Sequence, residues 1–308
     1  MELIHSDIKG PFPVPSIVGN YLYFIIFVDD LTRFTWIFPL RTTRSKEVVP
    51  TFKWFKDEVE IFTGLRIRCF RCDNDRGEYT NKAFQELLKE NHIEFVPSVP
   101  YHQYQNGISE RAIRTIIENG FAMLFDAHLP LNFWYEAMAT STYLKNISPT
   151  SAVQSKTPTE AWTNIKPTIS HLKRFGCDVH VLIPNEQRNT LQPIHSTLCW
   201  MMGYDKNTRS IWKVWDPTRN QMRRATSVWF DENSIGGRDP GDRAILKSTK
   251  MNLVNNHLAL DRTITEHREI GSVNNHLVSS LPIHTELSEE ELKQITTNFL
   301  EVVEELSK

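Results

Sequence analysis

The first forty residues contain apolar runs of strand length that are separated by short polar segments. Residues 2–7 predict a strand that ends at Asp7, and residues 21–30, which are aromatic and β-branched, predict a buried central strand. Residues 34–40 predict a third strand. The short polar link between the second and third runs indicates a β-hairpin, so we expect Asp29-Asp30 to be turn residues rather than metal ligands.

Apolar residues recur at helical spacing after the hairpin. Residues 45–62 predict a helix with Ser45 as its N-cap and Gly64 at its end. Its expected apolar face comprises Val48, Val49, Phe52, Phe55, Val59 and Phe62. A second helix should begin after the cap Thr80. The remaining predicted elements are strands over 67–72 and 93–96 and helices over 108–124 and 131–146.

The predicted order is three strands, helix, strand, helix, strand and then helices. This order is typical of an RNase H-like α/β domain, which has a mixed five-stranded sheet with flanking helices. We expect the first three strands to be antiparallel, with the fourth and fifth alongside them. The domain is expected to cover residues 1–150.

The remainder of the chain changes character. Residues 151–170 are polar and proline-bearing, which indicates a connector, and residues 171–235 contain short apolar runs that predict a small β-rich domain. Its tryptophans are expected in the core more often than stacked on bases; they are Trp200, Trp212, Trp215 and Trp229. Residues 236–287 are polar and predict a flexible linker. Residues 288–308 predict an amphipathic helix with a Ser288–Glu291 capping box.

Composition gives no global signature of nucleic-acid binding, because the formal net charge of the 308 residues is −2. Contact with DNA would therefore need local basic patches, and an ordinary solvated face is an equally good interpretation of the arginines near the acidic motifs. The four cysteines indicate a reducing compartment rather than disulfides, and the Cys69/Cys72 spacing is better explained by strand alternation than by zinc. No apolar run is long enough to span a membrane.

Three carboxylates carry the candidate chemistry. Asp7 ends the first predicted strand, Asp73 ends the fourth, and Glu110 lies early on a predicted helix. Two carboxylates on neighbouring strands and a third on a helix can hold two divalent cations over one phosphate, as in-line displacement at phosphorus requires. Mg²⁺ prefers oxygen ligands and retains water, so a few carboxylates suffice. Taken singly, each carboxylate is better explained as a strand-end, turn or surface helix residue.

The contexts of these carboxylates resemble, in order, the three motifs of the integrase catalytic core of copia-type long-terminal-repeat retrotransposons. The first motif resembles H-x-D-x-x-G-P and contains His5 and Asp7. The second resembles R-x-D-N-G-x-E-[FY] around Asp73. The third resembles P-[YH]-x-x-x-x-N-G-x-x-E-R and matches position by position at Pro100, Tyr101, Asn106, Gly107, Glu110 and Arg111. The resemblance continues through KTPTEAW, HLKRFGCDVHVLIP and KVWDPT, and covers roughly residues 1–235.

The second motif departs from the pattern. After Asp73-Asn74 the family has glycine, whereas this chain has Asp75-Arg76-Gly77-Glu78, which resembles a one-residue insertion. Asp73 keeps the preceding arginine context and is the preferred ligand, while Asp75 remains the alternative. A ligand misplaced by about 1 Å can lower a rate on the order of a hundredfold.

The resemblance implies a polynucleotidyl transferase that processes element DNA ends and joins them to target DNA. It implies two Mg²⁺ or Mn²⁺ ions held by Asp7, Asp73 and Glu110, and DNA contacts by Asn106, Arg111 and Arg114. Implied partners are element-end and target DNA, a second copy of the chain, and a chromatin protein through the tail segment LVSSLP at 277–282. We expect nuclear and cytoplasmic localisation and no membrane.

Two other interpretations stay open. The family's amino-terminal zinc module is not seen ahead of Asp7, which indicates a truncated and degenerate element whose product is a catalytically inactive relic that only binds DNA or protein. An RNase H-like nuclease acting on RNA–DNA hybrids is the third interpretation, and the N-G-x-x-E-R context disfavours it.

Overall fold

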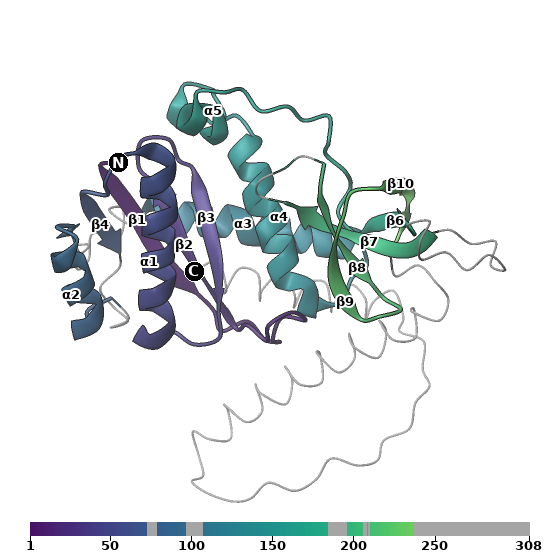
Figure 1. The fold of residues 1–308 in the computed structure, drawn as a ribbon, viewed down its shortest axis with the longest axis horizontal. Coiled ribbons are helices and arrows are strands. Elements are labelled where there is room, and N and C mark those ends of the chain that lie inside the picture. Colours follow the sequence, from purple (N-terminus) through teal and green to yellow (C-terminus); the bar gives the residue numbers. More distant parts are fainter. Residues whose placement is uncertain (73–78, 97–106, 184–195, 206–207, 209, 237–308) are drawn as a thin grey trace, which may run out of the picture. The chain divides into compact units, whose positions relative to one another are not determined.

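The computed structural model describes residues 1–72, 79–96, 107–183, 196–205, 208 and 210–236, and residues 1–236 form one compact unit (Figure 1). The predicted linker and the predicted helix over 288–308 lie outside the described residues. No helix within the described ranges is long and apolar enough to cross a membrane.

The first sheet is mixed and five-stranded, as predicted. Its order is β3-β2-β1-β4-β5. Strand β2 is antiparallel to both β1 and β3, and β4 is parallel to both β1 and β5. The strands are β1 (Leu3–Lys9), β2 (Tyr23–Asp29), β3 (Thr35–Leu40), β4 (Cys69–Cys72) and β5 (Glu94–Phe95).

Strand β1 does not end at Asp7 but continues to Lys9, because Ile8 pairs with Ile25 of β2 and is buried. Gly10 then ends the strand, with a positive φ of 136° that a residue with a side chain rarely adopts. Asp7 therefore lies within the paired part of the strand rather than at its end.

Helices α1 (Ser45–Thr63) and α2 (Lys82–Glu90) cover one face of this sheet. Aromatic rings dominate the contact, and Phe27 of β2 stacks on Phe55 of α1 with centroids 4.1 Å apart. The face contributed by α1 comprises Val48, Phe52, Phe55 and Val59. As predicted, Gly64 ends the helix in a left-handed conformation.

Three details of these helices were predicted wrongly. Ser45 is the first helical residue and Arg44 is the N-cap, without a side-chain cap. Asn81, not Thr80, caps α2 and accepts a hydrogen bond from the Phe84 amide. The side chain of Phe62 is 63% exposed, because it follows the last core-facing turn of α1.

Helices α3 (Gly107–Asp126) and α4 (Trp134–Ile147) pack on the opposite face, and a short 3₁₀ turn (Leu131–Phe133) precedes α4. Trp134 is fully buried and stacks on Phe12 with centroids 3.9 Å apart. Its indole N–H donates to the carbonyl of Val14 at 3.0 Å, so the polar edge of this ring is satisfied inside the core.

The second sheet is five-stranded and entirely antiparallel, in the order β10-β6-β7-β8-β9. Its strands are β6 (Cys177–Leu182), β7 (Ser196–Tyr204), β8 (Trp212–Asp216), β9 (Gln221–Ala225) and β10 (Val228–Ile235). The predicted connector contains a helix that the sequence reading missed, α5 (Pro158–Thr163), capped by Thr157. Trp215 is buried as predicted, whereas Trp229 is 60% exposed.

A polar contact joins β1 to the segment that precedes α2. The Ser6 and Tyr79 hydroxyls lie 2.9 Å apart, and both residues are buried. Cys72 points to the same core, whereas Cys69 is partly exposed, so strand alternation accounts for this pair of cysteines as expected.

The Tyr79→Phe substitution should lower the free energy of unfolding by about 1–3 kcal/mol, because the Ser6 hydroxyl loses its partner inside the core. Urea denaturation measures this. The double variant with Ser6→Ala should cost less than the sum of the two single variants, and strict additivity would contradict a bond between the hydroxyls.

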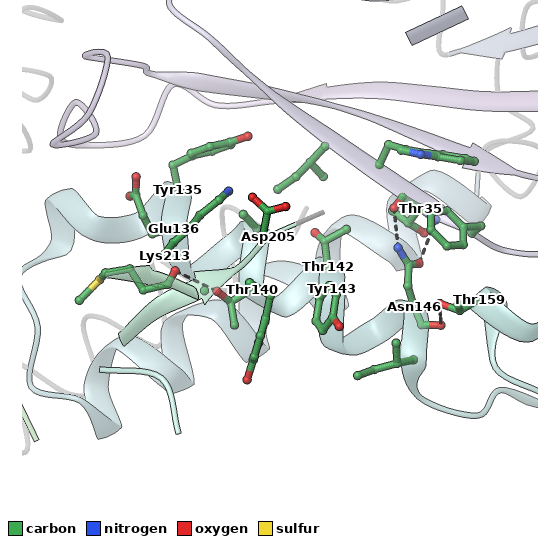
Figure 2. A pocket seen from close by; sticks show the side chains of 18 of the residues that line it. Thr35, Tyr135, Glu136, Thr140, Thr142, Tyr143, Asn146, Thr159, Asp205 and Lys213 are labelled. Carbon is green, nitrogen blue, oxygen red and sulfur yellow. Dashed lines mark hydrogen bonds between the residues drawn. The ribbon is translucent and has the colours of Figure 1, made fainter. Parts of the chain in front are cut away.

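Helix α4 also borders a cavity of about 710 Å³ (Figure 2). Glu136 lines it, is 8% exposed, and has an Oε2 atom without a hydrogen-bond partner among the described residues. Burial raises the pKa of Glu136 to about 7, and the nearby charge of Lys213 offsets only part of that effect.

This pKa predicts how stability changes with pH. Above the ordinary pKa of about 4.5 the unfolded chain releases the Glu136 proton, whereas the folded chain keeps it until about pH 7. Stability should therefore fall as pH rises between these values. The free energy of unfolding of the Glu136→Gln variant, relative to that of the wild type, should rise by about 3 kcal/mol between about pH 4 and about pH 8. Thermal or urea unfolding at the two pH values measures this difference. If this difference in the free energy of unfolding were the same at both pH values, Glu136 could not be buried in its protonated form.

Candidate functional site

Strand alternation places Asp7 on the sheet face that α3 and α4 cover. In β1, Ile4 and Ile8 belong to the core beneath α1, so His5 and Asp7 point to the other face. Asp7 pairs with Ile26 of β2, whose alternate neighbour Phe24 lies against Trp134 of α4. Asp7 is half-buried, and the Ile8 amide donates to its Oδ1 at 2.7 Å, which restrains the carboxylate.

The parallel pairing of β1 and β4 brings the second motif beside the first. Its register runs from Leu3 opposite Cys69 to Ser6 opposite Cys72, the residue that directly precedes Asp73. Asp73 and its alternative Asp75 lie outside the described residues. Arg71 shares the face of Asp7, because Phe70 and Cys72 belong to the core beneath α1 and α2.

Helix α3 supplies the third motif. Glu110 lies in its first turn and is exposed, between the buried Ser109 and the exposed Arg111. Arg111 folds back along that turn, since its Nη1 lies 3.4 Å from the position that a Cβ atom on Gly107 would occupy. Arg114, one turn later, is also exposed. Asn106 lies outside the described residues.

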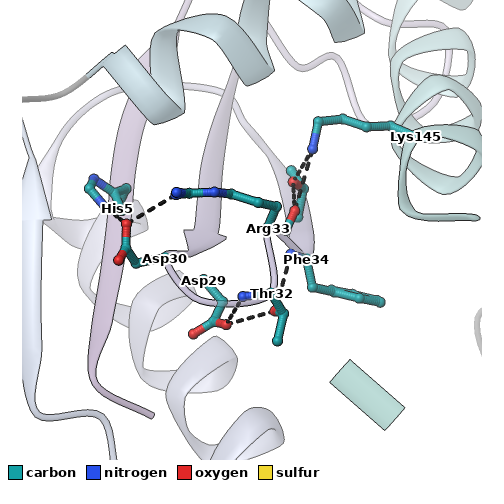
Figure 3. Close-up of polar contacts among 8 residues, drawn as sticks. His5, Asp29, Asp30, Thr32, Arg33, Phe34 and Lys145 are labelled. Carbon is teal, nitrogen blue, oxygen red and sulfur yellow. Dashed lines mark hydrogen bonds and ion pairs between the residues drawn. The ribbon is translucent and has the colours of Figure 1, made fainter. Parts of the chain in front are cut away.

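The turn between β2 and β3 contacts β1 two residues before Asp7. The imidazole Nε2 of His5 lies 3.0 Å from Oδ1 of Asp30, and Nη1 of Arg33 donates to the same oxygen at 3.0 Å (Figure 3). Burial lowers the pKa of His5, and the contact with Asp30 offsets only part of this. Burial alone would raise the pKa of Asp30, but His5 and Arg33 outweigh it and the net shift is downward.

These shifts fix the charges at neutral pH. His5 is neutral and Asp30 is ionised, so we assign the proton to Nε2, which donates to the carboxylate. The sequence reading assigned Asp30 to the turn, which is correct, but missed its contact with His5. The sequence around His5 carries no local signal of this contact, because the next residue, Ser6, is also polar and buried.

The same turn is attached to the end of α4. The Thr35 amide donates to Oδ1 of Asn146 at 2.9 Å, and Nδ2 of Asn146 donates back to the Thr35 carbonyl at 2.7 Å. Lys145 donates to the Thr35 hydroxyl at 2.8 Å (Figure 3). Asp29 accepts from the amide and hydroxyl of Thr32, as expected of a turn residue.

Basic side chains of the second sheet are largely paired with acids. Arg219 and Arg223 both contact Asp216, and Arg224 contacts Asp205 at 2.7 Å. Lys173 and Arg174 pair with Glu232 and Asp126. The exposed arginines of α3 are therefore better placed than these residues to contact phosphate.

The described residues alone do not bring together three acidic, histidine or cysteine side chains that could hold a metal ion. Asp7 and Glu110 come from elements that contact each other, β1 and α3, and Asp73 falls outside the described ranges. Asp7 thus faces the side of the sheet on which α3 packs, Glu110 lies in the first turn of that helix, and Asp73 directly follows β4 in the sequence.

Two segments of the chain match known protein families. Residues 1–103 match the integrase core domain family, and residues 177–243 match the retroviral polymerase SH3-like domain family. Over 235 residues, 76% of this chain, the sequence is 37% identical to the retrovirus-related Pol polyprotein from transposon TNT 1-94 of Nicotiana tabacum. It is 33% identical over 233 residues, again 76% of the chain, to that from transposon RE1 of Arabidopsis thaliana. The chain covers 17% and 15% of these relatives.

Solved structures that the chain matches in part include a simian T-cell lymphotropic virus intasome in complex with PP2A regulatory subunit B56 gamma. The identity is 14% and the TM-score 0.44, covering 73% of this chain and 76% of that one. The HTLV-2 integrase catalytic core domain in complex with magnesium gives 16% identity and a TM-score of 0.39, covering 52% and 95%. From the sequence matches, the chain carries the integrase core domain and the retroviral SH3-like domain of copia-type retrotransposon Pol polyproteins.

Proposed function

We propose that this chain performs metal-dependent DNA end processing and strand transfer, with Asp7, Asp73 and Glu110 as the catalytic carboxylates. The observation that carries the proposal is the parallel register of β1 and β4, which ends with Ser6 opposite Cys72. The residues that follow these two are Asp7 and Asp73. Helix α3, which contacts β1, begins on the same face and bears Glu110 in its first turn.

The donor set fits a hard divalent cation. Carboxylate oxygens are the ligands that Mg²⁺ and Mn²⁺ prefer, and Mg²⁺ needs few of them because it keeps bound water. Asp7 is half-buried and its carboxylate is restrained by the Ile8 amide. The side chain would therefore lose little conformational freedom when a metal ion binds. Two such ions, when bound, would activate the attacking oxygen and stabilise the leaving oxygen.

The remaining steps belong to DNA and to the side chains of this chain. In end processing, water attacks a phosphodiester near the element end and releases a free 3′-hydroxyl. In strand transfer, that hydroxyl attacks a phosphodiester of target DNA, and a 3′-hydroxyl of the target leaves. Arg111 and Arg114 are exposed beside Glu110 and would hold the DNA backbone through phosphate, which positions the duplex without reading its sequence.

The test is strand joining, and its reversal, on a branched oligonucleotide with Mn²⁺ and the full chain. Asp7→Asn, Asp73→Asn and Glu110→Gln should each lower the rate on the order of a hundredfold or more, because each removes a charged ligand worth several kcal/mol. Asp75→Asn should keep activity. Asp29→Asn is the matched control, because the Asp29 carboxylate accepts hydrogen bonds from Thr32 of the adjoining turn.

A relic without catalysis is the competing function, and the Asp75 insertion in the second motif favours it. A folded wild type that neither joins DNA nor binds Mn²⁺ would overturn the enzymatic proposal in its favour. Activity that is lost in Asp75→Asn and kept in Asp73→Asn would reassign the second ligand.

Binding to DNA should depend on the arginines of α3. Arg111→Ala and Arg114→Ala should each weaken binding similarly for unrelated duplex sequences and reduce the slope of log affinity against log salt by about one. Fluorescence anisotropy over a salt series measures both effects. Arg219→Ala is the control, since Arg219 is paired with Asp216. Equal slopes for all three variants would contradict an α3 contact.

A further inference from the structure

We propose that His5 and Asp30 form a positioning pair that fixes strand β1, and with it the carboxylate of Asp7, against the β2–β3 turn. This inference rests on the proposed function and adds to it two residues outside the carboxylate triad. Neither residue would touch metal or DNA, and both would act through Asp7.

The first support is the position of His5. It lies two residues before Asp7 on the same face of β1, so the two Cα atoms are about 7 Å apart along the strand. Its side chain is 1% exposed, and Nε2 contacts Asp30 Oδ1 at 3.0 Å. A displacement of His5 would therefore be passed along a single strand to Asp7.

The second support is the anchoring of Asp30 itself. Its amide donates to the Leu3 carbonyl at 3.0 Å, so the turn contacts β1 through backbone as well as through His5. Arg33 donates to the same Asp30 oxygen that contacts His5. The far end of the turn is bound to α4 by the two Thr35–Asn146 hydrogen bonds. Asp30 is thus attached to a turn that is itself held, and can serve as a fixed point.

The third support is the free-energy cost of burying a histidine side chain at position 5. His5 Nδ1 and Arg71 Nε are both buried without a hydrogen-bond partner among the described residues, and His5 and Arg71 are register partners across β1 and β4. A buried polar atom without a partner costs about 1–3 kcal/mol. A residue needed only for packing would be better replaced by an apolar side chain, so the stability of the fold does not explain His5. Its contact with Asp30 does.

The experiment compares His5→Ala, His5→Gln, Asp30→Ala and Asp29→Ala in the full chain. Half-saturating Mn²⁺ should rise about ten- to a hundredfold in His5→Ala and Asp30→Ala, the effect usual for residues that support metal ligands. The kcat of strand joining should fall on the order of ten- to a hundredfold, with the KM for DNA unchanged. His5→Gln should recover most of both losses, since its amide nitrogen can reach the position of Nε2.

Asp29→Ala is the matched control, because it removes the neighbouring carboxylate, which contacts Thr32 whereas that of Asp30 contacts His5. A purely structural role for His5 would lower the melting temperature but leave Mn²⁺ affinity and kcat as in Asp29→Ala. That result, or no recovery in His5→Gln, would overturn the proposal.

A readout without metal separates this inference from the proposed function. Amide hydrogen exchange of residues 6–9 should be faster in His5→Ala than in Asp29→Ala, whether or not the wild type is active. An inactive wild type that binds no Mn²⁺ would overturn the proposed function. Amide hydrogen exchange in β1 would then still test whether His5 and Asp30 position this strand. Equal exchange in the two variants would overturn the positioning pair.

Discussion

The parallel pairing of β1 with β4 is the constraint on which the rest of the site depends. These strands are 66 positions apart at their paired residues Leu3 and Cys69, and their register ends with Ser6 opposite Cys72, the residues that directly precede Asp7 and Asp73. Side chains on a strand alternate between faces, so a slip of one residue would turn Arg71 from the face of Asp7 toward α1 and α2. The apolar pattern of β4 prevents this slip, because Phe70 and Cys72 are committed to the core.

Helix α4 contacts several of the elements that surround strands β1 and β4. Its first residue, Trp134, fills the core beneath the sheet, and its last turn holds the β2–β3 turn through Asn146. From its middle, Thr140 donates to the Met202 carbonyl of β7. Motion of either sheet relative to the helix would therefore strain buried hydrogen bonds. This explains how the β2–β3 turn can serve as a fixed reference for β1.

The fold of the first domain could be predicted from the sequence, because its strands and helices have distinct apolar periods and Gly64 ends α1 as expected. Capping was predicted less well. Ser45 and Thr80 are good capping residues by type, but the competing choice of Arg44 and Asn81 depends on where the preceding backbone turns. Helix α5 was missed because six residues in a proline-bearing segment give no periodic signal.

In the candidate site, too, the residues in sequence motifs could be predicted, whereas a contact that depends on the folded backbone could not. Asp7 and Glu110 could be predicted as site residues because they stand in motifs, and the structure places them on the contacting elements β1 and α3. The pairing of His5 with Asp30 could not be derived from the sequence, because it joins residues 25 positions apart through a turn whose geometry depends on Arg33 in a left-handed conformation. Asp29 and Asp30 are adjacent in sequence, yet the carboxylate of Asp30 contacts His5 whereas that of Asp29 contacts Thr32, and no local pattern distinguishes them.

The central claim is that β1 and β4 present Asp7 and Asp73 to the same metal ions, with Glu110 completing the site. Anomalous diffraction from crystals of the full chain soaked in Mn²⁺ tests it most directly. The account predicts anomalous peaks in contact with the carboxylates of Asp7, Asp73 and Glu110. Peaks that involve Asp75 in place of Asp73 would contradict the register argument, and an ordered site without any peak would contradict the metal-dependent function.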